Sequence, residues 1–146
     1  MGRILGIDCG RKRIGLAITD PLGVFASPLE TVNADQFDRF IDDYLKTVSI
    51  DEFVIGYPVQ LNNKPSESVI YVEPFIRKLK KRFPGKPVNT IDERFTSQMA
   101  LRAMIDGGMK KKERQKKTSA DKISAAIILQ SFLDKKSNER SAGKLK

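Results

Sequence analysis

The chain has 146 residues, 40% of them hydrophobic, which is enough for one compact domain with a buried core. Its 27 lysines and arginines against 18 acidic residues give a formal net charge of +9, which favours a polyanionic partner such as nucleic acid without establishing one. A single cysteine, Cys9, and the absence of histidine exclude an internal disulfide, a multi-cysteine zinc cluster, a serine–histidine triad and imidazole ligands. Any metal ion must therefore sit on oxygen ligands, which points to Mg²⁺ or Mn²⁺.

The first part of the chain predicts three consecutive strands. Two apolar runs, residues 4–9 and 14–19, are separated by a glycine-led turn at 10–13 and should form a hairpin. A third strand is expected over residues 24–32, after the turn signal at 21–23. Three strands before any helix indicate an antiparallel meander that opens a mixed sheet.

Helices and strands then alternate. Asn33 offers a helix cap with Gln36 three residues later, and apolar residues recur at helical spacing as far as Leu45. The later predicted elements are a strand at 52–56, a helix at 67–82, a strand at 87–92, a helix from 96 or 97 to 104 or 105, and a last helix from 118 to about 133. This order predicts an α/β domain in which helices flank a mixed five-stranded sheet.

The domain is expected to cover residues 1–136, followed by a polar, disordered tail at 137–146. The amino-terminal residues lack the pattern of a secretory signal, and no segment approaches the roughly 20 apolar residues of a membrane span. The predicted location is therefore the cytoplasm.

Asp8 closes the first predicted strand and is the first candidate for chemistry. It ends an apolar run that should otherwise be buried, and burial of a lone charge is costly unless the charge is paired or holds a metal ion. The simpler interpretation is that Asp8 caps the turn at Gly10.

Further acidic residues lie at the ends of other predicted elements. One of Asp92 and Glu93 ends the strand at 87–92, although the pair could equally solvate that strand end. Asp121 fits a helix-capping pattern, but the helix after it is apolar almost all round, which predicts burial and an Asp121 that faces the sheet. Three converging carboxylates could hold two metal ions about 4 Å apart, as hydrolysis of a phosphodiester requires.

Basic residues next to these acids could hold a phosphate backbone, although a charge run is often only a solvated loop. Arg11, Lys12 and Arg13 form the turn beside Asp8, and Arg94 could meet a phosphate or pair with its neighbours. The second basic run directly precedes Asp121. It consists of Lys110, Lys111, Lys112, Arg114, Lys116 and Lys117.

Three blocks of this sequence resemble the YqgF family, in the same order and with similar spacing, over residues 4–133. They are Gly6-Ile7-Asp8-Cys9-Gly10 with its continuation to Asp20, Asp92-Glu93-Arg94-Phe95-Thr96-Ser97, and Asp121 to Gln130. The resemblance implies an RNase H-like fold with the first three strands antiparallel. It also implies that Asp8, Glu93 and Asp121 are the catalytic, metal-binding acids.

Members of that family are described as Holliday junction resolvases and as pre-16S rRNA nucleases. The resemblance thus implies a nuclease that uses Mg²⁺ or Mn²⁺, two ions in all, to process the 5′ end of pre-16S rRNA. Two departures affect the match. Cys9 stands where the family often has an aromatic residue, and the segment at 56–64 lacks the usual Met-Asp-Gly.

Other interpretations stay open. A resolvase of four-way DNA junctions would use the same acids but needs a stable dimer for two symmetric cuts, whereas the sequence shows no dimer face and predicts a monomer or weak homodimer. An actin-like ATPase shares the glycine–isoleucine–aspartate segment but requires two lobes. A non-catalytic ribosome-assembly factor could bind RNA through the basic residues without cutting it.

Overall fold

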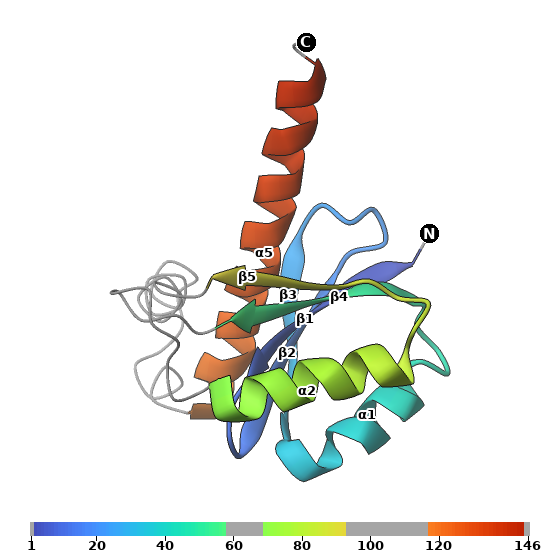
Figure 1. The fold of residues 1–146 in the computed structure, drawn as a ribbon. Coiled ribbons are helices and arrows are strands. Elements are labelled where there is room, and N and C mark those ends of the chain that lie inside the picture. Colours follow the sequence, from blue (N-terminus) through green and yellow to red (C-terminus); the bar gives the residue numbers. More distant parts are fainter. Residues whose placement is uncertain (1, 58–68, 93–116, 145–146) are drawn as a thin grey trace.

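The computed structural model describes residues 2–57, 69–92 and 117–144 (Figure 1). The strands are β1 (Arg3–Cys9), β2 (Arg13–Thr19), β3 (Ala26–Asn33), β4 (Ile50–Tyr57) and β5 (Val88–Asp92). The helices are the 3₁₀ helix η1 (Ala34–Gln36), α1 (Phe37–Tyr44), α2 (Val69–Arg82) and α5 (Lys117–Lys144). Most of the segment at 56–64, the helix predicted from 96 or 97, and most of the second basic run lie outside the described residues.

The strands form one five-stranded sheet in the order β3-β2-β1-β4-β5. β1 pairs antiparallel with β2, and β2 pairs antiparallel with β3, so the predicted meander is confirmed. β4 then lies parallel to β1 on its other side, and β5 lies parallel to β4. The mixed sheet confirms the predicted α/β class.

The sheet has a helical layer on each face, and alternation along the strands separates two cores (Figure 1). On one face, Leu5 and Ile7 of β1 pack in a cluster with side chains of α1 and α2. On the other face, Ile4 belongs to a cluster with Ala125 and Leu129 of α5. Neighbouring residues of β1 therefore serve different helices, which is why this strand reads as a continuous apolar run.

Two predicted boundaries between β2 and α1 need correction. β3 begins at Ala26 rather than at residue 24, because the Asp20 carboxylate accepts the backbone N–H groups of Val24 and Phe25 at 2.8 and 2.9 Å and holds them in a turn. The Asn33 side chain makes no capping hydrogen bond. The chain instead enters through η1, and the α-helix begins at Phe37.

The last helix is longer than predicted. α5 continues from Leu133 to Lys144, and in Figure 1 its carboxyl-terminal part extends beyond the sheet. The polar residues after Leu133 include lysine, glutamate and arginine, which are good helix formers even without an apolar face to bury. None of the helices in the described part of the chain has the length and apolar character needed to cross a bilayer.

Candidate active site

One edge of the sheet gathers the strand ends that the sequence analysis singled out. Because β1, β4 and β5 run parallel, their carboxyl ends lie at the same edge, where Tyr57 pairs with Asp92. The turn of the β1–β2 hairpin also lies there, since Cys9 pairs with Ile14. The structure thus places Asp8 of β1 at the edge where sites are commonly built in sheets of this kind.

Asp8 lies on the α5 side of the sheet. Ile4 belongs to the cluster under α5, and Gly6 faces the same helix, so Asp8 shares their side by alternation along β1. Asp8 pairs with Gly15 of β2 and is half-buried. Its carboxylate is therefore held by a central strand rather than by a loop, which disfavours a simple turn-capping role.

α5 approaches β1 unusually closely beside Asp8. A Cβ atom built on Gly6 would lie 2.7 Å from the Leu129 Cβ and 3.0 Å from the Ala125 carbonyl oxygen, so only glycine fits at this position. Lys136, which follows Ala125 by about three turns of α5, contacts Glu52 near the start of β4. Because β4 is parallel to β1, α5 runs antiparallel to both, and its first turns lie toward the edge that carries Asp8.

The basic hairpin turn is positioned by backbone contacts. The Gly10 N–H donates to the Arg13 carbonyl at 2.9 Å, and a Cβ on Gly10 would lie only 2.6 Å from that oxygen, so the turn requires glycine. The Lys12 carbonyl accepts the Ala34 N–H at 2.8 Å. Arg11 and Lys12 are exposed and Arg13 is half-buried, which brings three cationic residues to the same edge as Asp8.

The other predicted site residues are not brought together by the described structure. Glu93, Arg94 and the basic residues at 110–116 lie outside it, while Asp121 and Lys117 belong to α5 without described side chains. Among the residues that are described, no group of three or more Cys, Asp or Glu side chains could hold a metal ion. The site of three acids therefore remains a prediction, of which the structure positions Asp8.

Tyr57 is a polar group at this edge that was not among the predicted site residues. Its hydroxyl donates to Glu73 Oε1 of α2 at 2.5 Å. This hydrogen bond, together with burial, raises the pKa of the Tyr57 phenol, so the group stays protonated. No local pattern indicated the contact, because Glu73 belongs to a different predicted element.

Comparison with known proteins decides the family. A family model described as "RuvX: Holliday junction resolvase" matches residues 2–135. The chain belongs to the RuvX family. The resemblance to YqgF is thereby confirmed, as RuvX and YqgF are two names for this family, and so is the predicted enzyme class, a nuclease.

RuvX relatives match almost the whole chain. A protein of Bacteroides fragilis is 49% identical over 136 residues, which cover 93% of this chain and 99% of the relative. A protein of Bacteroides thetaiotaomicron is 48% identical with the same coverage of both chains. Each is named "Putative pre-16S rRNA nuclease".

Solved structures place the RuvX chain among resolvase folds. The fowlpox virus resolvase, in complex with substrate Holliday junction DNA, superposes with a TM-score of 0.58 at 15% identity, covering 91% of this chain and 97% of that one. RuvC of T. thermophilus, in complex with a Holliday junction substrate, gives 0.56 at 18% identity, covering 94% and 96%. At such identities the likeness concerns the fold alone, and it confirms the expected RNase H-like architecture.

Proposed function

We propose that this chain is an endonuclease that processes the 5′ end of pre-16S rRNA, with divalent metal ions held by Asp8, Glu93 and Asp121. The observation that carries the proposal is the placement of Asp8. It is a half-buried carboxylate on a central strand, at the carboxyl edge of the sheet and on the side covered by α5. The basic turn beside it offers Arg11, Lys12 and Arg13 to a phosphate backbone.

Strand parity supports the choice of Glu93 over Asp92 as the second acid. Ile91 packs in the cluster under α5, whereas Val88 packs in the cluster on the opposite side. Odd-numbered positions of β5 therefore face the same side as Asp8, and Glu93 has that parity. The residue pattern alone left both acids open, and the resemblance to the family pointed to Glu93.

Helical spacing supports Asp121 in the same way. It precedes the buried Ala125 by four residues, which is about one turn, on the helix whose first turns lie toward the Asp8 edge. Four residues of helix rise about 6 Å, which is close to the spacing of two residues along a strand. Position 121 of α5 is therefore expected at the level of Asp8, as Ala125 lies at the level of Gly6.

The donor set fits a hard divalent cation. Asp8 supplies carboxylate oxygen, the ligand type that Mg²⁺ and Mn²⁺ prefer. The softer ligands that other metals prefer are nearly absent, because the chain has no histidine and only one cysteine. Two such ions, when bound, would activate water and stabilise the leaving oxygen. Arg94 and the basic residues Lys110, Lys111, Lys112, Arg114, Lys116 and Lys117 are proposed as further contacts to the substrate.

The proposal extends to organisation and location. The nuclease domain is expected to span residues 1–136. The polar tail predicted at 137–146 was expected to be disordered, whereas α5 includes its residues up to Lys144. The cytoplasm remains the predicted compartment. RNA is favoured as substrate because the relatives with 48–49% identity are named for pre-16S rRNA.

Replacement of Asp8 tests the function. Asp8→Asn should reduce cleavage of pre-16S rRNA in Mg²⁺ or Mn²⁺ by at least about 100-fold, while RNA affinity and the unfolding midpoint stay near wild type, because the change removes one charge and almost no volume. Asp35→Asn is the matched control, since Asp35 is an exposed carboxylate in η1. Cleavage by Asp8→Asn at the wild-type rate would refute the assignment.

A second candidate, resolution of four-way DNA junctions, is favoured by the description of the family model. The same assay should therefore include a junction, with the oligomeric state measured in parallel. Symmetric cuts in the junction by a stable dimer, with pre-16S rRNA left intact, would replace the RNA proposal. RNA binding without cleavage of either substrate would favour the non-catalytic assembly factor.

A further inference from the structure

A groove follows the outer edge of the sheet between β5 and α5, and neither Asp8 nor the basic hairpin turn lines it. It has a volume of about 430 Å³ and is lined by residues 88–91 of β5 and by Phe132, Lys135 and Lys136 of α5. β5 is the last strand of the sheet, so the groove lies along its outer side. One end of β5 is Asp92, at the edge that carries Asp8, and the groove therefore leads away from the proposed active site.

The backbone of β5 presents hydrogen-bonding groups to this side. The Phe53 N–H donates to the Pro87 carbonyl at 2.9 Å, which sets the phase of the parallel ladder. Bonds to β4 then fall on alternate residues of β5, namely Asn89 and Ile91, and the N–H of Thr90 is directed away from β4. The Thr90 side chain has the parity of Val88 and lies on the face opposite α5, so this residue offers its backbone N–H to the groove.

Lys135 supplies the positive charge. It is exposed, and within the described ranges it forms no ion pair. Lys136 is already engaged, because its Nζ lies 3.1 Å from Glu52 Oε1 and 5.5 Å from the centroid of the Phe132 ring. These contacts fix the wall of the groove and leave the charge of Lys135 available to a ligand.

The Glu52 carboxylate lies behind that wall and binds two of its residues. Its second oxygen accepts the Asn89 side-chain amide at 2.8 Å, so β4, β5 and α5 are tied together behind the groove. The side chain of Glu52 is only 16% exposed, which makes this a preformed surface rather than a chance meeting of solvated chains.

The groove suits one strand of nucleic acid. An ammonium and a backbone N–H are donors from which phosphate oxygens accept hydrogen bonds in protein–nucleic acid complexes. The volume lies within the range of about 300–1,000 Å³ that holds a small molecule, so the groove has room for one nucleotide of a strand.

We propose that this β5 groove binds a backbone phosphate of the single-stranded RNA segment that adjoins the scissile bond. The inference rests on the proposed nuclease function and deepens it, because it names the part of the substrate that the enzyme grips beside the cut. Lys135 and Thr90 are positioning residues in this scheme. They hold the strand that enters the site and take no part in its cleavage.

The test compares two charge reversals, Lys135→Glu and Lys80→Glu. Lys80 is an exposed lysine of α2 outside the groove, so it reports the loss of a positive charge as such. Each protein is titrated with a hairpin RNA that carries a ten-nucleotide single-stranded extension and with the same hairpin lacking it. Thr90→Val is measured alongside, and circular dichroism checks the fold of every variant.

Lys135→Glu should weaken binding of the extended RNA by about tenfold at 0.1 M salt and lower the slope of log affinity against log salt by about 0.7, the value expected for one lost phosphate contact on a single strand. Lys80→Glu should stay within about threefold of wild type, and all variants should bind the hairpin without the extension alike. Thr90→Val should bind the extended RNA as wild type does, because it keeps the backbone N–H and changes a side chain on the opposite face. If Lys135→Glu and Lys80→Glu weaken binding equally, the groove is not a phosphate-binding site.

Cleavage separates this inference from the proposed function. If wild type cuts pre-16S rRNA while the two lysine variants bind the extended RNA equally, the groove is wrong and the nuclease proposal stands. If wild type binds the extended RNA in the predicted way but never cuts, the nuclease proposal fails and the groove survives as a binding site. If Lys135→Glu weakens binding of junction DNA but of no RNA, the ligand of the groove is DNA and the assignment of RNA is wrong.

Discussion

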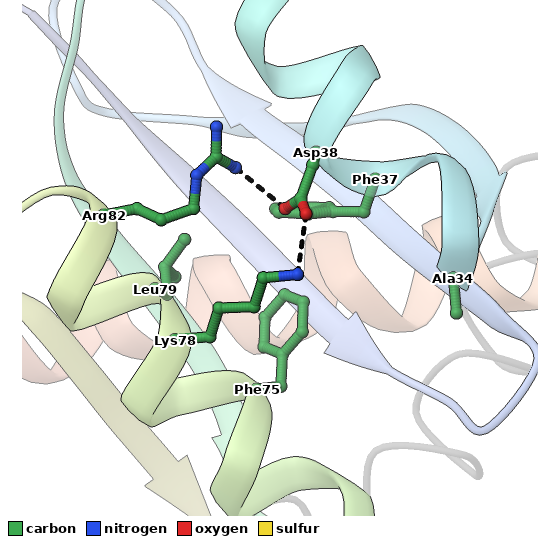
Figure 2. Close-up of a pocket in the computed structure, with 7 residues that line it drawn as sticks. All are labelled: Ala34, Phe37, Asp38, Phe75, Lys78, Leu79 and Arg82. Atoms are coloured by element: carbon green, nitrogen blue, oxygen red, sulfur yellow. Dashed lines mark hydrogen bonds and ion pairs between the residues drawn. The ribbon is translucent and has the colours of Figure 1, made fainter.

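The two faces of the sheet are built differently. Under α1 and α2 the core contains large side chains, including edge-to-face packing of Phe37 on Phe75 with ring centroids 5.0 Å apart. Ion pairs join these helices at the surface, where Asp38 lies 2.7 Å from the Lys78 ammonium and 2.8 Å from Arg82 (Figure 2). Under α5 the contact at β1 is made by Gly6 and the small Ala125, so the backbone of the helix lies close to the backbone of the strand.

This difference assigns separate tasks to the two faces. Large apolar side chains bury the most area and so contribute most to the free energy of unfolding. Small residues bury less but set the distance between α5 and β1 within narrow limits. The α1–α2 face should therefore govern stability, whereas the α5 face should govern the geometry around Asp8.

The largest effect on stability is expected from Phe53→Ala. Phe53 is fully buried in the cluster under α1 and α2 and packs on Phe83 with centroids 5.4 Å apart. The loss of volume should lower the free energy of unfolding by about 3–5 kcal/mol. Chemical denaturation measures that loss, and cleavage per folded molecule should change little. If the fully folded variant loses much of its specific activity, the α1–α2 face does more than stabilise the protein, and the assignment of separate tasks is wrong.

Gly6→Ala should have a smaller effect on stability and a larger one on activity. The added Cβ would meet Leu129 at 2.7 Å, and such overpacking should cost about 1–3 kcal/mol. Because the strain displaces α5 relative to Asp8, cleavage should fall even where the protein is folded. Gly85→Ala is the control, since a Cβ there would have no neighbour within 4 Å. The comparison is contradicted if the two variants lose equal activity.

The smallest effect is expected from Asp38→Asn. The hydrogen bond from Lys78, with the nearby charges of Lys78 and Arg82, holds the pKa of Asp38 below its ordinary value. A carboxyl whose folded pKa is lowered stabilises the protein above its unfolded pKa of about 4 and loses that contribution as pH falls through the folded value.

Asp38→Asn should thus lower the free energy of unfolding by about 1 kcal/mol or less at pH 7, since the Asp38 side chain is 45% exposed and solvent screens the pairs. The difference from wild type should shrink below about pH 4. Denaturant unfolding at both pH values measures it. A difference that grows on acidification would show that the ion pairs are not its source.

Local patterns were sufficient for most of the fold. The hairpin of β1 and β2 follows from two apolar runs around Gly10, and α2 was predicted to end at Arg82, where it does. These features depend on neighbours in the chain, such as a turn glycine or the proline and glycine that follow a helix. The end of α5 was missed because the prediction used burial as the sign of a helix, and helix propensity can continue where burial stops.

By itself, the sequence determined the chemistry that is available and the elements that carry it. The absence of histidine limits metal ligands to oxygen, and the run that ends in Asp8 puts a carboxylate on a buried strand. Both conclusions need only residue types and short spacings.

Only the tertiary structure decided what those elements face. The close approach of Gly6 to Leu129 shows that Asp8 lies on the α5 side. The packing of α5 beside β5 brings Lys135 and Thr90 to one groove. These pairs are far apart in the chain, and alternation along a strand names two faces without saying which helix will cover each. That choice is made by the packing of the whole domain, because only there does each apolar face find its partner.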